Sequence, residues 1–83
     1  MKTEKNTHEL QLYYFDECPF CQRVLNYLKE NPKKVTLKNI NTTPAYKDEL
    51  IQIGGKSQVP CLVIGTTPMY ESLDIIKWLE ENA

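Results

Sequence analysis

The sequence has little glycine, almost no charge imbalance and no long apolar run, and each shortage excludes a class of protein. Only three of the 83 residues are glycine, while 41% are apolar and 25% charged, a composition unlike that of fibrous or disordered chains. Ten Lys and Arg against eleven Asp and Glu leave a formal net charge of -1. Such a balance gives no long-range field for a polyanion, so we expect no nucleic acid partner. Because the apolar runs extend over a few residues only, neither a membrane span nor a secretion signal is expected.

Cysteine is also scarce, and its odd number argues against a secreted domain held together by disulfides. The three cysteines are Cys18, Cys21 and Cys61, whereas disulfide scaffolds carry more of them in even numbers. In a reducing compartment, two cysteines close in sequence usually serve chemistry or bind a metal. We therefore expect a soluble cytoplasmic protein, with a flexible tail at residues 1–8 and one globular domain at residues 9–83.

The hydrophobic pattern predicts strands and helices in the order βαβαββα. The expected strands cover residues 10–15, 35–40, 61–64 and 69–70, and the expected helices extend from about 18 to 31, 43 to 54 and 72 to 81. In the last helix, Leu73, Ile76 and Leu79 form the expected apolar stripe. The early β-α-β units favour parallel strands and the late hairpin favours antiparallel ones. The fold class is thus α/β, with a small mixed four-stranded sheet and helices on both faces.

The segment Cys18-Pro19-Phe20-Cys21 lies where the first strand gives way to a helix. Its spacing of three places both sulfurs on one helical face, within the range of a disulfide. Unpaired N–H groups and the helix dipole favour a thiolate at a helix N-terminus. We therefore predict that Cys18 is the more acidic and more exposed nucleophile, and that Cys21, one turn further, is the buried resolving thiol. The neighbouring Asp16 and Glu17 act against a low pKa of Cys18.

The cysteine pair has two other possible interpretations, a metal site and inert packing in the core. A structural zinc ion needs four ligands, and beyond the pair the chain offers only Cys61 and His8, so no metal is expected. Inert packing in the core is plausible for Cys21 alone. At a helix start, beside Pro and two acids, it is improbable for Cys18. A reversible redox pair is the favoured interpretation.

With Val59-Pro60, which lies 39 residues beyond Cys21, the cysteine motif resembles the dithiol glutaredoxins of the thioredoxin-like fold. The resemblance covers roughly residues 9 to 82. It implies an enzyme of glutathione-dependent thiol–disulfide exchange, with Cys18 and Cys21 as catalytic residues and Pro19 and Phe20 in support. It also implies a cis peptide bond before Pro60, where the Val59 backbone pairs with the cysteine of glutathione.

The resemblance further assigns residues to the two ends of glutathione, the implied cosubstrate. Glu71-Ser72 matches the γ-glutamyl site and also resembles the Glu-Ser pair of glutathione transferase N-terminal domains. A helix N-terminus and a hydroxyl suit the α-carboxylate, and the Glu carboxylate suits the α-ammonium. Alternatively, Ser72 only caps the helix. Lys56 matches a basic position that meets the glycyl carboxylate, or is an ordinary loop lysine.

Some positions depart from the glutaredoxin pattern. Gln58 stands where Thr is usual, Met69-Tyr70 where the family has Gly-Gly, and Phe20 where Tyr is commoner. The bulk of Met69-Tyr70 is expected to reshape the groove for glutathione. Cys61, directly after Pro60, is expected to be a small buried residue.

The resemblance implies a monomeric oxidoreductase of cell redox homeostasis and electron transport. Its substrates would be glutathionylated and disulfide-containing client proteins. Two alternatives remain open. One is an iron–sulfur cluster carrier, which Pro19 disfavours by analogy within the family. The other is a thioredoxin-like electron donor served by a flavoprotein reductase.

Overall fold

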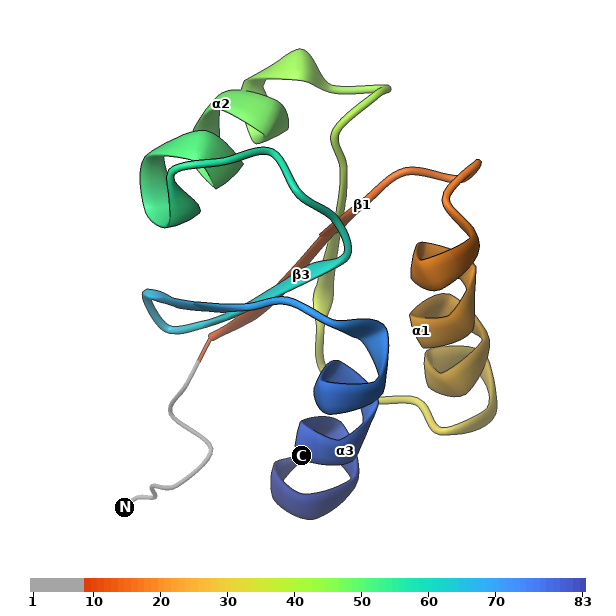
Figure 1. Ribbon diagram of the computed structural model, residues 1–83. Helices are drawn as coiled ribbons and strands as arrows, with labels where there is room; N and C mark the ends of the chain where they lie inside the picture. The colour runs from red at the N-terminus through yellow and green to blue at the C-terminus, as the bar shows by residue number, and fades with distance from the viewer. Residues whose placement is uncertain (1–8) are drawn as a thin grey trace.

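The computed structural model describes residues 9–83, and the expected tail at residues 1–8, with His8, lies outside the described part. Along the chain the elements are β1 (Leu10–Tyr14), α1 (Pro19–Glu30), β2 (Thr36–Asn39), α2 (Pro44–Gly54), β3 (Cys61–Ile64), β4 (Thr67–Met69) and α3 (Ser72–Asn82) (Figure 1). The predicted order βαβαββα is confirmed. The main difference is at the hairpin, where β4 begins and ends earlier than predicted and Tyr70 lies outside it.

The strands form one mixed sheet in the order β2-β1-β3-β4. β1 pairs with β2 in parallel, β1 with β3 antiparallel, and β3 with β4 antiparallel. In the β1–β3 pair, Tyr13 lies opposite Cys61. Because the two strands are antiparallel, the C-terminal end of β1 lies beside the N-terminal end of β3. The segment that follows β1 toward Cys18 and the segment that precedes β3 at Pro60 are therefore close together.

Helices cover both faces of the sheet, as expected: α2 lies on one face, and α1 and α3 on the other (Figure 1). Side chains that follow one another along a strand point to opposite faces. The buried cluster on the α1–α3 face consists of Leu12, Val24, Leu62, Ile75 and Leu79, and the cluster on the α2 face of Tyr13, Ile40, Leu50, Cys61 and Val63. β1 and β3 therefore supply both cores.

Proline and glycine set the ends of the first two helices where the sequence predicts them. Pro19 and Pro44 occupy the first turns of α1 and α2, where a missing N–H costs no hydrogen bond. α1 ends at Asn31, whose N–H donates to the Tyr27 carbonyl at 2.8 Å. Gly55, the residue after α2, caps the helix in the left-handed conformation with φ 79°.

The buried face of α3 differs from the predicted stripe. Leu73 is 65% exposed, whereas Ser72, Ile75 and Leu79 are buried. Ser72, the first helical residue, is already buried, so the residues three and seven positions later on the same side of the helix, Ile75 and Leu79, are buried with it. This rotation leaves Leu73 at the molecular surface. None of the helices in residues 9–83 is long and apolar enough to cross a membrane.

Candidate functional site

Cys18 occupies the N-cap position of α1. Its backbone is extended, with φ -82° and ψ 116°, and Pro19 begins the helix. The Cys21 N–H donates a hydrogen bond to the Cys18 sulfur at 3.2 Å. A sulfur in this position receives an otherwise unpaired N–H and faces the positive end of the helix dipole, and both stabilise negative charge. Cys18 therefore lies at the start of a helix, as predicted.

Both cysteines of the pair are buried free thiols. Cys21 is fully buried, as predicted. Cys18 is the more exposed of the two, as predicted, but the difference is small, because only 7% of this residue is accessible. The Cys18 N–H donates to the Phe15 carbonyl at 3.3 Å, and the sulfur turns back over the first turn toward the Cys21 N–H, so that little of the residue faces solvent. Asp16 and Glu17 are exposed, where water and salt screen their charges.

The environment of Cys21 strongly favours its neutral thiol. Burial is the main cause and the hydrogen bond to Cys18 the second. The Phe15 backbone acts against them, the charge of Cys18 adds the least, and together they raise the pKa of Cys21 to about 12. Cys21 thus keeps its proton at neutral pH. The two thiols differ in position, since Cys18 holds the N-cap of α1 and Cys21 lies one turn further along the helix.

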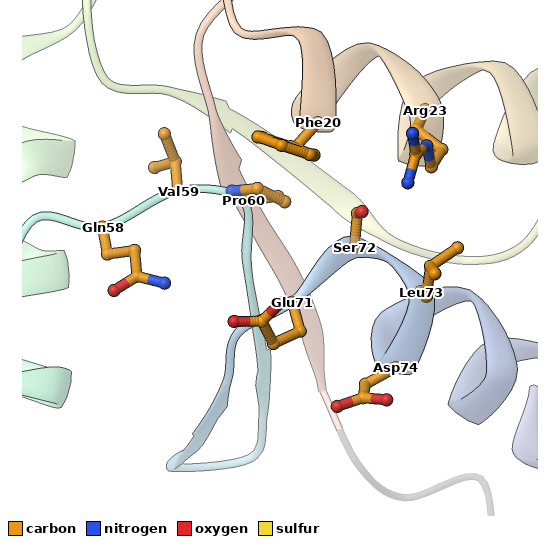
Figure 2. A pocket seen from close by; sticks show the side chains of 9 residues that line it. All are labelled: Phe20, Arg23, Gln58, Val59, Pro60, Glu71, Ser72, Leu73 and Asp74. Atoms are coloured by element: carbon orange, nitrogen blue, oxygen red, sulfur yellow. The ribbon is translucent and has the colours of Figure 1, made fainter.

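A groove of about 540 Å³ opens where α1, the start of β3 and the start of α3 meet. Its lining consists of Phe20, Arg23, Gln58, Val59, Pro60, Glu71, Ser72, Leu73 and Asp74 (Figure 2). The peptide bond between Val59 and Pro60 is cis, as the resemblance implies. The groove brings together five of the nine residues expected at the site, namely Phe20, Val59, Pro60, Glu71 and Ser72, whereas Cys18, Pro19 and Cys21 are not among its lining residues.

The start of α3 forms one wall of the groove. Glu71 is the N-cap residue, with a left-handed backbone at φ 71°, and its side chain makes no capping hydrogen bond. Ser72 is the first helical residue and is 5% exposed. Figure 2 shows the Ser72 hydroxyl turned toward Phe20 and the Glu71 carboxylate on the same wall. Because Glu71 and not Ser72 holds the cap position, both side chains remain available to a ligand.

Three of the lining residues were not predicted from the sequence to belong to the site: Arg23, Leu73 and Asp74. The Arg23 guanidinium lies 5.7 Å from the centre of the Phe20 ring, a distance that allows a cation–π contact. A spacing of three from Phe20 was the available signal for Arg23. With one cation and the two carboxylates of Glu71 and Asp74, the α1–α3 end of the groove complements a ligand that carries an ammonium and a carboxylate.

Lys56, Met69 and Tyr70 do not line this groove. The Lys56 ammonium lies 4.4 Å from the centre of the Tyr70 ring. Met69 packs against the α1–α3 cluster and Tyr70 against the α2 cluster. The side chains of Met69 and Tyr70 are therefore accommodated by the two cores and do not fill the groove.

Cys61 is fully buried in the α2 cluster, as expected. Burial raises the pKa of its thiol to about 11. Within residues 9–83, no three His, Cys, Asp or Glu side chains are grouped so that they could hold a metal ion.

Comparison with known proteins agrees with this architecture. Residues 12–83 match the family model described as glutathione S-transferase, N-terminal domain. No curated protein matches the sequence. A glutaredoxin from Archaeoglobus fulgidus superposes with a TM-score of 0.71 and 20% identity, over 90% of this chain and 89% of the archaeal one.

Two solved transferases are also similar. Glutathione transferase Omega 3C from Trametes versicolor gives a TM-score of 0.74 and 29% identity, over 93% of this chain and 34% of its own. A glutathione transferase homologue from Drosophila mojavensis, solved with bound glutathione, gives a TM-score of 0.72 and 21% identity, over 90% of this chain and 35% of its own. This chain thus spans about a third of the length of these transferases. Since the family model covers nearly the whole sequence, the chain belongs to the family of glutathione S-transferase N-terminal domains and has the thioredoxin-like fold.

Proposed function

We propose that this chain is a glutathione-dependent thiol–disulfide oxidoreductase with Cys18 as its nucleophile. The observation that carries the proposal is the Cys18 sulfur at the N-terminus of α1, which accepts the Cys21 N–H. A thiolate in such a position is both a good nucleophile and a good leaving group, as exchange in both directions requires. The presence of glutathione in a solved transferase of similar fold supports glutathione as the ligand of the groove.

In the first reaction, the Cys18 thiolate attacks the glutathione sulfur of a mixed disulfide between a client protein and glutathione. The client sulfur leaves as a thiolate and takes up a proton, and a Cys18–glutathione disulfide forms. A second glutathione thiolate then attacks the glutathione sulfur of this disulfide. Oxidised glutathione is released and the Cys18 thiolate is restored. The client sulfur is thereby reduced to a thiol, the incoming glutathione thiol is oxidised to the disulfide level, and the glutathionyl group taken from the client keeps its oxidation level.

The groove supplies the contacts that orient glutathione. The Val59 backbone beside the cis peptide bond pairs with the backbone of the glutathione cysteine. Glu71 and Ser72 hold the γ-glutamyl group through its ammonium and carboxylate. The resemblance assigns the glycyl carboxylate to Lys56. Because the Lys56 ammonium lies over Tyr70, we assign a share of this contact to the amide of Gln58, which lines the groove.

A second route uses both thiols to reduce a protein disulfide. The Cys18 thiolate attacks one client sulfur and expels the other as a thiolate, and Cys21 then attacks the Cys18 sulfur. The client leaves with the electron pair and receives the proton that Cys21 gives up, while Cys18 and Cys21 close their disulfide. Two glutathione molecules reduce that disulfide and are themselves oxidised.

The test is mass spectrometry of Cys21→Ser after exposure to oxidised glutathione, with Cys18→Ser as the matched control. We expect one glutathionyl adduct, located on Cys18, in Cys21→Ser and none at this position in the control. In coupled assays, Cys18→Ser should lose all activity, whereas Cys21→Ser should retain deglutathionylation and lose reduction of protein disulfides. Equal activity of the two variants would contradict the assigned roles.

Two further outcomes would replace the proposal. Activity with a flavoprotein reductase but none with glutathione would identify a thioredoxin-like electron donor. A brown protein with visible absorbance after anaerobic purification would identify an iron–sulfur cluster carrier.

A further inference from the structure

The Tyr70 side chain packs against the backbone at the end of α2. Tyr70 belongs to the partly buried residues around the α2 cluster. A Cβ atom added to Gly54, the last residue of α2, would overlap the Tyr70 hydroxyl oxygen and lie 3.2 Å from the ring carbon that bears it. Because glycine has no Cβ atom, Gly54 makes room for the tip of the Tyr70 ring. Neither Gly54 nor Tyr70 lines the groove.

The Tyr70 ring lies in a slot between Gly54 and Lys56, where packing and a cation–π contact hold it. The Tyr70 hydroxyl oxygen is buried and makes no hydrogen bond of good geometry to any residue in the described part of the chain. Lys56 covers the ring, with its ammonium 4.4 Å from the ring centre, at a distance typical of a cation–π contact. The slot is therefore formed by Gly54 below the ring tip and Lys56 above the ring face.

Tyr70 directly precedes the residue with the least favourable backbone conformation. Glu71 is the one residue other than glycine with positive φ within residues 9–83, at 71°. A side chain disfavours this conformation, which persists only where the surrounding structure imposes it. On its C-terminal side, Glu71 is held by α3, because its carbonyl accepts the Ile75 N–H at 3.0 Å. On its N-terminal side, the docked Tyr70 ring is the nearest anchor along the chain.

We propose that Gly54, Tyr70 and Lys56 act as positioning residues for the ligand-binding end of α3. By docking against the end of α2, the Tyr70 ring holds Glu71 in its left-handed conformation. The Glu71 carboxylate and the first turn of α3 then face the groove (Figure 2). The inference rests on the proposed function, because it assumes that this end of the groove takes the γ-glutamyl group. The glutaredoxins that the chain resembles have two glycines where it has Met69-Tyr70, so this chain uses a docked side chain at that position.

The central variant is Gly54→Ala. Gly54 is helical and its φ is not positive, so alanine is compatible with its backbone and favoured by helix propensity. The added methyl meets the Tyr70 hydroxyl and displaces the ring. We expect the KM for a glutathionylated peptide to rise about fivefold or more, with a kcat within about twofold of wild type, since the Cys18 helix end is untouched.

The rescue variant is Gly54→Ala combined with Tyr70→Phe. Removing the hydroxyl removes the atom that the methyl overlaps, and the remaining contact of 3.2 Å needs only a small shift. We expect this double variant to return to the KM of Tyr70→Phe alone. That single variant should resemble wild type, because within residues 9–83 the hydroxyl it loses makes no hydrogen bond of good geometry and interacts only weakly with the buried Cys61 thiol. Gln52→Ala, at an exposed position of the same helix, is the matched control.

Results other than these would contradict either the positioning role or the proposed function. A wild-type KM in Gly54→Ala, or a defect that persists in the double variant, removes the positioning role while leaving the proposed function intact. If Gly54→Ala does not fold, Tyr70→Ala, which empties the slot without adding a clash, must show the rise in KM, or the inference fails. If wild-type protein neither binds nor uses glutathione, the proposed function fails and the inference falls with it.

Discussion

At the scale of single residues, Cys21 is the group whose environment most constrains the proposed chemistry. Its pKa of about 12 results first from burial and then from the hydrogen bond and charge of Cys18. Once Cys18 is part of a mixed disulfide, it carries neither a proton nor a negative charge, so its contribution to this pKa disappears. Burial remains, and a raised pKa keeps the thiolate fraction of Cys21 small at neutral pH.

We therefore predict that closure of the Cys18–Cys21 disulfide is strongly pH-dependent. Below the pKa of Cys21, the thiolate fraction rises about tenfold per pH unit, and the closure rate should follow it between about pH 7 and about pH 9. The measurement is release of a client held on Cys18 as a mixed disulfide, in a single turnover without glutathione. Cys21→Ser, as control, should release none. A closure rate that already levels off near neutral pH would contradict the raised pKa.

At the scale of elements, the helix starts could be predicted and the rotation of the helices about their axes could not. Pro19, Pro44 and the glycine after α2 determine boundaries through their own backbone chemistry, which is visible in the sequence. The exposure of Leu73 depends on how α3 packs against the sheet, and that contact is made by residues distant in sequence. An apolar residue at helical spacing therefore does not by itself show which face is buried.

The same distinction applies to the site. The thiol pair, the cis proline and Glu71-Ser72 lie in short motifs and could be predicted from them. Arg23 becomes part of the groove only because α1 and α3 lie side by side, and Lys56 leaves it only because Tyr70 lies in reach of its ammonium. The spacing of three from Phe20 places Arg23 on the same side of α1 but does not show that α3 lies beside it, and the position of Lys56 over Tyr70 has no local sequence signal.

The juxtaposition of α1 and α3 makes Arg23 the one cationic side chain among the residues that line the groove. We predict that Arg23→Ala raises the KM for glutathionylated substrates about three- to tenfold, because an exposed charge–charge contact contributes about 1 kcal/mol. Steady-state kinetics at low and high salt would measure this, and the effect should shrink with salt.

Lys29→Ala is the matched control for Arg23, since it removes a charge from the last turn of the same helix outside the groove. Arg23→Lys should recover part of the loss. A KM equal to that of the Lys29 variant would mean that Arg23 does not contact the ligand.

At the scale of the whole molecule, the sheet forms the middle layer between two small cores. Leu62 on β3 is fully buried in the core shared by α1 and α3, whereas Leu37 on the edge strand β2 is 48% exposed. A domain of this length has a free energy of unfolding of about 4 to 12 kcal/mol. The loss of one central side chain is therefore a large part of the total.

We predict that Leu62→Ala lowers the free energy of unfolding by about 2 to 5 kcal/mol, through lost burial and the cavity left behind. Leu37→Ala should change it by less than about 1 kcal/mol, because its side chain already contacts water. Urea unfolding with the cysteines kept reduced would measure both. Similar losses in the two variants would show that the layers do not pack as described.

The antiparallel pairing of β1 with β3 also has a consequence during synthesis of the chain. A ribosome that has released only the first half has already delivered Cys18 and Cys21, the thiols of the proposed reaction, but not yet Pro60 or the start of α3. The nascent polypeptide therefore carries its reactive group before the surface that selects its reaction partner. Until the second half arrives, the groove that we propose for glutathione lacks two of its walls.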